Sequence, residues 1–175
     1  MPAKTEAALG LPLGLADKLF LSLEGAEEFE KDTRLFGRID RAGTGAYHFR
    51  PFGRPQIEVY LGGRPASELE AAGEGAFFDF AVSELTVLLG SAFVHRIRPI
   101  QIHRWGADPF SRGSYSFALP GCADCRQALA AAVYDRLFFA GEACSSADFS
   151  TAHGAFLTGV AAADHVIAVR AARRP

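Results

Sequence analysis

The sequence predicts a mixed fold of the α+β or α/β class, in which a sheet region with helices is followed by a strand–loop–helix unit. Asp17–Leu23 alternates apolar and polar residues, as a half-buried strand does. Gly75–Gly90 carries apolar residues at helical spacing. Arg136–Ala162 runs from a short apolar segment through a polar turn into a long helical pattern.

Composition and length narrow the class of protein. The chain has 175 residues, 49% of them hydrophobic, which suits one globular core. The net charge of −2 and the absence of a Lys/Arg block argue against nucleic acid or an anionic membrane as a partner. We expect no stretch of transmembrane length and no secretory signal, and therefore a cytoplasmic protein.

The cysteines and histidines do not form a recognisable metal site. Cys122 and Cys125 make a CxxC, but a second ligand pair at zinc spacing is missing. His95 and His103 are separated by too irregular a stretch to indicate a metal pair, and a structural role is predicted for both. We predict no metal and a structural or incidental role for both cysteines.

The first half of the chain contains most of the predicted strands. Residues 1–10 are expected to be a mobile end, and Glu24–Thr33 a charged loop or short helix. Ala46–Arg50 and Gln56–Leu61 are predicted strands, and Ala66–Ala72 a short helix. Along the longer helix of Gly75–Gly90, the predicted core positions are Phe77, Ala81, Leu85 and Leu88.

The second half is predicted to end in the strand–loop–helix unit. Ile97–Trp105 is a predicted strand, Asp108–Pro120 a loop and Cys122–Val133 a helix. Leu137–Ala140 is predicted as a short strand, and a helix from Thr151 to about Ala172 follows. The packing stripe expected on that helix consists of Phe156, Val160, Ala163 and Ile167.

The strand–loop–helix unit has features of a ligand site. Glu142 follows the predicted strand directly, where open α/β sheets bind their ligands. Ser150 and Thr151 are candidate N-caps, and the N-terminus of a helix suits an anionic group. The alternative is a strand, loop and capped helix packed for stability alone.

Three motifs resemble the flavin-dependent amine oxidases, which include monoamine oxidases, polyamine oxidases and flavin-dependent histone lysine demethylases. Arg136–Ala162, with the sequence RLFFAGEACSSADFSTAHGAFLTGVAA, resembles the C-terminal FAD-contacting motif of that family. Trp105–Ser116 resembles the family segment that precedes the last strand, and Leu15–Leu21 is a weaker third match. The resemblance extends from about Leu11 to Val166.

The resemblance implies a division into two domains. Residues 1–103 resemble part of the substrate-binding domain, and residues 104–175 the C-terminal part of a Rossmann-like FAD-binding domain. A G-x-G-x-x-G fingerprint, which holds the ADP half of FAD in the family, does not occur in this sequence. The chain therefore looks like the C-terminal portion of a longer enzyme: a fragment, a split gene product or a degenerate relative.

Two catalytic residues follow from the resemblance. Lys18 matches the family lysine that holds a water beside flavin N5, and Tyr115 matches an aromatic wall of the substrate site. Trp105 would pack on the flavin ring system. From the strand pattern alone, Lys18 is better explained as a strand-end lysine that extends to solvent. With the resemblance, the two interpretations are about equally supported.

The cofactor-binding residues implied by the resemblance are Gly141, Glu142, Ser150, Thr151 and Ala152. Glu142 would accept hydrogen bonds from ribityl hydroxyls, and the N–H groups of Thr151 and Ala152 would face the flavin N1–C2=O edge. Ser150 stands where many amine oxidases carry a second aromatic wall.

The expected function is oxidation of an amine to an imine, which hydrolyses to a carbonyl compound and ammonia, while oxygen reoxidises FAD and gives hydrogen peroxide. The alternative is a non-catalytic, truncated relative that acts as a binding or assembly module without flavin. A small-molecule amine is the expected substrate, and an N-terminal FAD-binding half on another chain a possible partner. We expect the chain alone to bind FAD weakly or not at all, to expose apolar surface and to self-associate.

Overall fold

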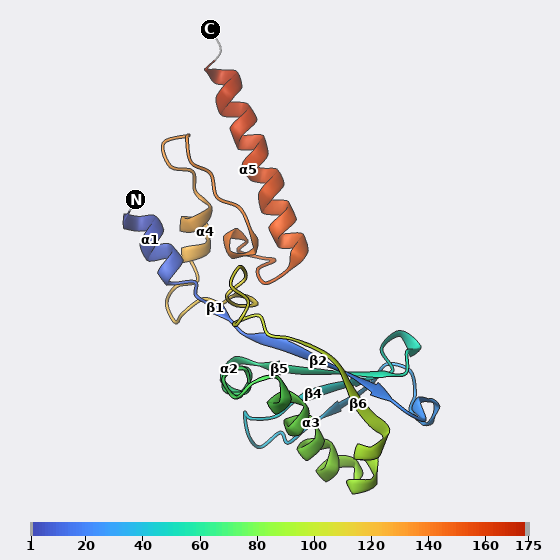
Figure 1. Cartoon of the computed structure of the whole chain (residues 1–175). Helices are drawn as coiled ribbons and strands as arrows, with labels where there is room; N and C mark the ends of the chain where they lie inside the picture. Colours follow the sequence, from blue (N-terminus) through green and yellow to red (C-terminus); the bar gives the residue numbers. More distant parts are fainter. Residues whose placement is uncertain (1, 174–175) are drawn as a thin grey trace. The chain divides into compact units, whose positions relative to one another are not determined.

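The computed structural model describes residues 2–173 and divides the chain into two compact units (Figure 1). Unit 1 contains the residues up to Gly14 and those from Tyr115 onward, and unit 2 is Leu15–Ser114. The α-helices are α1 (Pro2–Leu9), α2 (Gly63–Ala72), α3 (Glu74–Leu89), α4 (Cys125–Ala130) and α5 (Ala152–Ala172). The strands are β1 (Leu13–Gly14), β2 (Ala16–Leu23), β3 (Thr33–Phe36), β4 (Ala46–Phe49), β5 (Gln56–Gly62), β6 (Ile97–His103) and β7 (Tyr115–Ser116).

Unit 2 is an antiparallel sheet in the order β3-β4-β5-β2-β6, with α2 and α3 against one face (Figure 1). The strands predicted at residues 17–23, 46–50, 56–61 and 97–105 are confirmed as β2, β4, β5 and β6. Strand β3 was not predicted, because its four residues follow a charged loop and do not show a strong alternation. Its hydrogen bonds come from pairing with β4, which is a tertiary contact.

The core of unit 2 lies between this sheet and α3. Phe77, Ala81 and Leu85 on α3 are fully buried, as their helical spacing predicted. They belong to one apolar cluster with Leu19 and Leu21, the inward-facing residues of β2. Phe-rich spacing on this helix therefore marks core packing.

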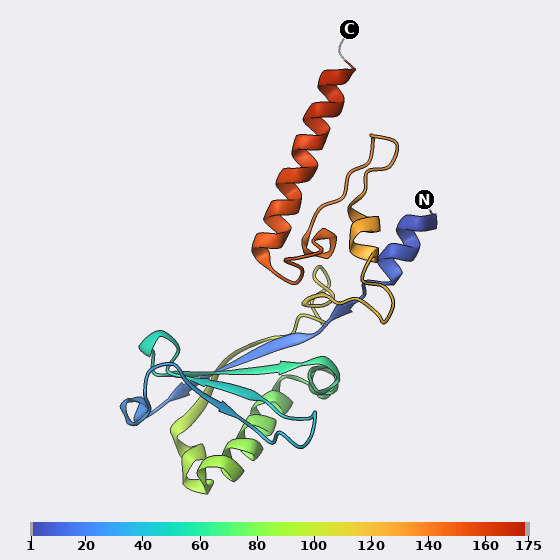
Figure 2. The same ribbon diagram turned by 180° about the vertical axis from the view of Figure 1, so that it is seen from behind.

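The N-terminal segment is a helix, so the prediction of a mobile end at residues 1–10 is wrong. Helix α1 packs beside α4 within unit 1 (Figure 2). The Lys4 Nζ donates hydrogen bonds to the carbonyl oxygens of Ala128 (2.5 Å), Leu129 (2.8 Å) and Ala131. Because these carbonyls end α4 and have no partner within the helix, Lys4 fixes α1 to it.

Two predicted elements of unit 1 differ from the structure. Leu137–Ala140 is not a strand: Leu137 forms an isolated bridge with Val133, and the following residues are irregular. A strand requires a neighbour to take its backbone hydrogen bonds, and none of the described residues lies alongside this segment as a strand. The helix predicted at Cys122–Val133 is also shorter, since α4 covers only Cys125–Ala130.

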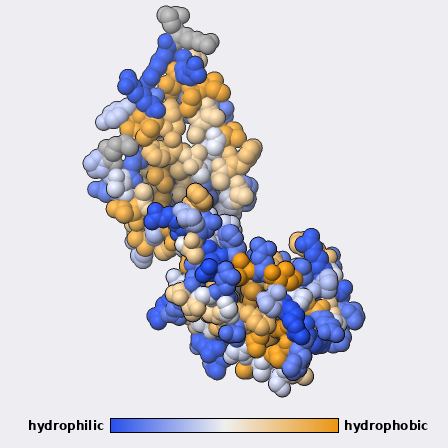
Figure 3. Space-filling view, in the orientation of Figure 1, coloured by the Kyte–Doolittle hydropathy of each residue, from blue (hydrophilic) through white to orange (hydrophobic). Residues whose placement is uncertain are grey.

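Helix α5 begins and ends as predicted, but most of it is not packed against the described residues. Phe156, Val160 and Ile167 are exposed, so the predicted stripe is not buried here (Figure 3 shows much orange, hydrophobic surface on unit 1). By length and composition this helix is apolar enough to cross a membrane, contrary to the expectation that no stretch reaches that length. One such helix is weak evidence for a span, because core helices of soluble proteins pass the same test.

The two units divide the chain at other points than residue 103. The first residues of the chain join the C-terminal unit through the pairing of β1 with β7. Residues 104–114 belong to unit 2, where Ser114 Oγ accepts a hydrogen bond from Ala16 N at 2.8 Å. The assignment of domain roles stays a prediction.

Candidate functional site

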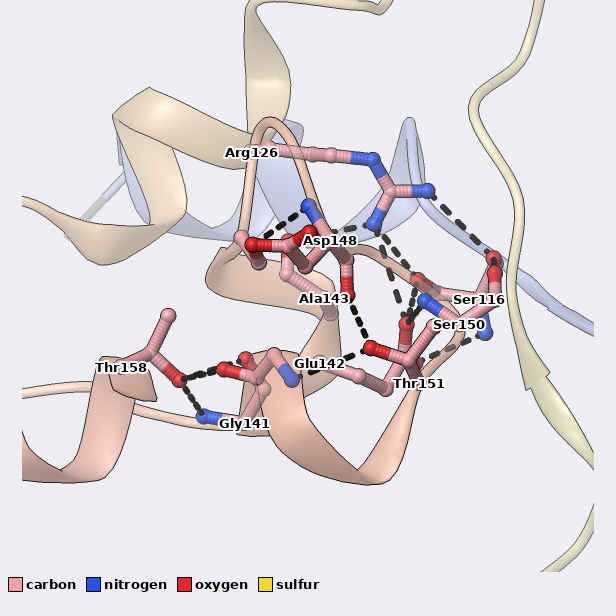
Figure 4. A network of polar contacts seen from close by, with 11 residues as sticks. Ser116, Arg126, Gly141, Glu142, Ala143, Asp148, Ser150, Thr151 and Thr158 are labelled. Carbon is pink, nitrogen blue, oxygen red and sulfur yellow. Dashed lines mark hydrogen bonds and ion pairs between the residues drawn. The ribbon is translucent and has the colours of Figure 1, made fainter. Parts of the chain in front are cut away.

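A polar network centred on Glu142 organises unit 1 (Figure 4). One carboxylate oxygen accepts a hydrogen bond from Ser116 N at 2.8 Å. The other accepts from Ser116 Oγ at 2.9 Å and from Ser150 N at 2.8 Å. Ser150 Oγ donates in return to Ser116 O at 3.1 Å. Glu142 thus joins three separate segments: β7, the turn after Leu137–Ala140, and the residue that precedes the N-cap of α5.

Arg126 completes this network from α4. Its guanidinium is almost fully buried and donates to Ser116 Oγ at 2.8 Å and to Ser116 O at 3.3 Å. It lies 3.9 Å from the Glu142 carboxylate and stacks over the Phe149 ring at 4.3 Å. A buried charge requires such partners. Our sequence reasoning missed Arg126, because an arginine in a short helix is ordinarily exposed and nothing in the local pattern marks it as buried.

The N-terminus of α5 is held in place by Thr151. Its hydroxyl accepts a hydrogen bond from Gly154 N at 3.0 Å, which confirms the predicted N-cap. The same hydroxyl donates to Asp148 O at 2.6 Å. Among the described residues, nothing accepts a hydrogen bond from the N–H groups of Thr151 and Ala152. These two groups remain available to a ligand.

Gly154 lets the preceding loop lie directly on the first turn of α5. A Cβ at this position would lie 1.9 Å from Asp148 O, a distance that no real side chain adopts. Gly141, whose φ of 131° favours glycine, is fixed to the same helix, because its N–H donates to Thr158 Oγ1 at 3.0 Å. The loop therefore wraps the start of α5 at two points.

In unit 2, Lys18 lies on the sheet face opposite to α3. It is paired across strands with Tyr60 on β5 and with His103 on β6. Its Nζ donates to Glu58 Oε2 at 3.0 Å, and about half of its side chain is exposed. An ammonium group has three N–H donors. Glu58 therefore leaves donors of Lys18 for a water or a ligand.

His103 connects Lys18 to Trp105. The His103 and Trp105 rings lie 3.9 Å apart, centroid to centroid, at an interplanar angle of 56°. The backbone N–H of Trp105 donates to Asp17 Oδ1 at 3.2 Å. Lys18 and Trp105, predicted from separate motifs, are thus joined through one histidine, which the sequence analysis had regarded as structural only.

Asp17 is fully buried beneath this group, and its second carboxylate oxygen has no hydrogen-bond donor. Burial raises the pKa of Asp17 to about 6, the Trp105 N–H lowers it in part, and the neighbouring Glu70 carboxylate raises it further. Glu70 itself accepts a hydrogen bond from Gly106 N at 2.9 Å. The two carboxylates thus anchor the backbone at Trp105 and Gly106.

The predicted site residues fall into two groups, one in each unit. Gly141, Glu142, Ser150, Thr151 and Ala152 surround the N-terminus of α5, and Tyr115 lies in β7 beside Ser116. Lys18 and Trp105 lie together in unit 2. Among residues 2–173, no three His, Cys, Asp or Glu side chains are grouped to hold a metal ion.

Comparison with known proteins identifies the family. The profile of the flavin-containing amine oxidoreductases matches residues 1–167. The chain belongs to this family. Polyamine oxidase 2 of Arabidopsis thaliana is 33% identical over 168 residues, which cover 92% of this chain and 33% of that protein. Lysine-specific histone demethylase 1 homolog 2 of Arabidopsis thaliana is 31% identical over 183 residues, covering 97% of this chain and 24% of the relative.

A solved structure agrees with the fold of an amine oxidoreductase. A putrescine oxidase variant, redesigned in its cofactor binding, matches with a TM-score of 0.72 at 14% identity. The match covers 96% of this chain and 38% of that one. The chain spans between a quarter and a third of the length of the curated relatives named above. The mixed α/β fold class and the recognition of the family are confirmed.

Proposed function

We propose that this chain forms the C-terminal part of an FAD-dependent amine oxidase that converts an amine to an imine and passes the electrons to oxygen. The observation that carries the proposal is the network of Glu142, Ser116, Ser150 and Arg126, which fixes the N-terminus of α5 with two N–H groups left over. A helix N-terminus with free donors suits an anionic group. The small-molecule substrate is a polyamine or another amine, as the names of several relatives suggest.

The residues present fit one side of a flavin. The N–H groups of Thr151 and Ala152 would hold the N1–C2=O edge, and the positive end of the α5 dipole would stabilise negative charge there. Glu142 holds the surrounding loop, because both of its oxygens already accept hydrogen bonds from the chain. Bound FAD would supply the redox chemistry by accepting a hydride equivalent from the carbon that bears the amine.

Lys18 would position a water next to the reacting atoms. Glu58 takes one N–H of its ammonium group and fixes the direction of the side chain. The remaining donors would orient a water and move a proton at the lysine nitrogen. Trp105, held by His103 and Asp17, would give a flat apolar wall. Tyr115 would offer its ring face to the substrate ammonium.

The ADP half of FAD would be held by polypeptide outside this sequence, either in a longer protein or on a second chain. The sequence lacks a glycine fingerprint, and the chain covers about a third of its curated relatives. We accordingly propose that the chain alone binds FAD weakly. A visible spectrum of the purified chain after addition of FAD measures this directly, and a stoichiometric, tightly held flavin would contradict it.

The catalytic proposal is tested in the protein completed by its dinucleotide-binding half. We expect anaerobic amine to bleach the flavin, and oxygen to restore it with release of hydrogen peroxide. Lys18→Met keeps the apolar stem and removes the donor, so turnover should fall by about 10²–10⁴-fold at unchanged flavin content. Lys31→Met, at an exposed lysine near Asp32, is the matched control and should leave turnover unchanged.

Stopped-flow measurement of the reductive and oxidative half-reactions shows which step depends on the lysine. Equal rates for Lys18→Met and the parent protein in both half-reactions would remove Lys18 from the mechanism. A completed protein that holds flavin but oxidises no amine would instead refute the proposed reaction, and would favour a binding or assembly role.

A further inference from the structure

The two cysteines of the CxxC motif lie together in unit 1, at the start of α4. The Cys122 side chain lies close enough to Cys125 to raise the pKa of the Cys125 thiol. The Cys125 N–H also donates to Cys122 O at 3.1 Å, which closes a turn between the two residues. Such a turn keeps the Cα atoms within about 7 Å. That separation overlaps the range of about 4.4–6.8 Å that a disulfide requires.

Gly10, the residue after α1, leaves space for both thiols because it has no side chain. A Cβ on Gly10 would lie 2.8 Å from Cys125 Sγ and 3.0 Å from Cys122 Sγ, so both sulfurs face the same bare stretch of backbone. Leu119 N donates to Gly10 O at 3.0 Å and holds this segment against the loop that leads to Cys122. Both thiols are partly exposed, whereas the third cysteine, Cys144, is buried.

We propose that Cys122 and Cys125 form a redox-active dithiol, which a peroxide oxidises to an intramolecular disulfide. In the first step one sulfur attacks a peroxide oxygen; the O–O bond breaks, an S–O bond forms, and one water leaves with the thiol proton when the oxidant is hydrogen peroxide. In the second step the other sulfur attacks the sulfenic sulfur; the S–S bond forms and a second water leaves. Two thiols are oxidised and one peroxide is reduced to two waters.

The site is independent of flavin chemistry, because the oxidant can be added from outside. Desolvation, together with the neighbouring Cys122, raises the pKa of Cys125, so little of this thiol is in the nucleophilic thiolate form at neutral pH and we expect oxidation to be slow. Two partly exposed thiols without further ligands do not make a zinc site. Oxidation is therefore the reaction that this pair of side chains fits.

The test uses the full chain, hydrogen peroxide and a thiol-alkylating reagent. We expect two of the three thiols to be lost together, the mass to fall by two hydrogens, and a peptide map to show Cys122 bonded to Cys125. Dithiothreitol should restore both thiols. Cys144→Ser should form the same bond, whereas Cys122→Ser and Cys125→Ser should not. Independent oxidation of each cysteine to sulfinic acid, or disulfides only between chains, would overturn the proposal.

A pair of glycine variants tests whether the geometry at Gly10 matters. Gly10→Ala would place a methyl group against both sulfurs, and we expect disulfide formation several-fold slower than in the parent chain. Gly75→Ala, where nothing lies within 4 Å of the added Cβ, should form the bond at the parent rate. Equal rates in all three proteins would show that the contact with Gly10 does not hold the thiols together, and would contradict the inferred site.

Discussion

Unit 2 and unit 1 differ in how completely each buries its own apolar side chains. In unit 2, the residues of β2, β4, β5 and α3 that face inward are fully buried in one cluster. In unit 1, the longest helix of the chain buries only Gly154 completely, and Phe156, Leu157 and Ile167 are exposed. Both units have strongly apolar helices, so composition alone does not explain the difference.

The difference lies in what is available to cover the apolar residues of each helix. The apolar residues of α3 meet a sheet that is formed by the same hundred residues. Helix α5 is held near its start by Thr151, Thr158 and the loop from Gly141, and His165 contacts Phe138 and Asp135 further along it. Most of its large apolar side chains are nevertheless exposed. Exposed apolar patches on a folded unit usually mark an interface. We therefore expect unit 2 to be self-sufficient and α5 to depend on a further polypeptide.

The largest expected difference between the units is in the loss of stability when a phenylalanine is replaced by alanine in each of them. Phe77→Ala removes a fully buried ring from α3 and should lower the free energy of unfolding by about 3–5 kcal/mol, through lost burial and a cavity. Phe156→Ala on α5, where the side chain is 69% exposed, should change it by about 0.5 kcal/mol or less. Chemical denaturation measures both, and equal losses would show that α5 is packed within this chain.

The stability of unit 2 should depend on pH through the buried carboxyl group of Asp17. The pKa of Asp17 is raised in the folded state to about 6 from an ordinary value of 3.8, so the folded chain binds the extra proton. The stability from that proton is complete below the ordinary pKa and is lost as pH rises through 6. Asp17→Asn lacks this dependence, so its stability relative to the parent should rise by up to about 3 kcal/mol between pH 4 and 7.

Denaturation at several pH values checks this expectation. Asp79→Asn, at an exposed position of α3, is the control and should follow the parent protein across the whole range. Asp32, Asp40 and Asp108 have lowered pKa values through their hydrogen bonds, and they contribute equally to all three proteins. A constant difference between Asp17→Asn and the parent would show that Asp17 is not protonated near neutral pH.

Two glycines on α5 should respond in opposite directions. Gly154→Ala forces a methyl group into Asp148 O and should destabilise unit 1 by about 1–3 kcal/mol, as other overpacked sites do. Gly159→Ala, five residues later with nothing within 4 Å, should stabilise the helix by about 0.5–1 kcal/mol. Thermal unfolding of both variants gives the comparison. A neutral Gly154→Ala would mean that the loop does not lie on the first turn.

A moderate loss of stability in unit 1 should come from substitution of Glu142, the carboxylate that joins its segments. Glu142→Gln keeps the shape but replaces one accepting oxygen by an NH2 group, which would face a backbone N–H of Ser116 or Ser150, and it removes the charge near Arg126; it should cost about 1–2 kcal/mol. Glu68→Gln breaks an exposed ion pair with Arg64 on α2 and should cost about 0.5 kcal/mol or less. Hydrogen exchange at Ser116 and Ser150 should become faster only in the first variant.

Local patterns were sufficient to predict much of unit 2 and the start of α5. Alternation in β2 placed Leu19 and Leu21 inward and Lys18 outward, because successive side chains of a strand point to opposite faces. Helical spacing located Phe77 and Leu85 in the core. Thr151 was recognised as a cap because its hydroxyl can replace the missing acceptor of a first helical turn. Each of these features depends on residues that are close together in the sequence.

The tertiary structure decided what depends on distant residues. Leu137–Ala140 has the composition of a strand, yet it forms none, because no other described strand takes its hydrogen bonds. Arg126 can be buried only because it meets Ser116, which lies 10 positions before it in the sequence, and Glu142, which lies 16 positions after it. His103 meets Lys18 only because β6 pairs with β2. The sequence by itself therefore determined most of the helices and strands, because periodicity shows which face of an element a residue lies on. Which polar groups meet was decided by the tertiary structure, because periodicity does not show which distant residue packs against that face.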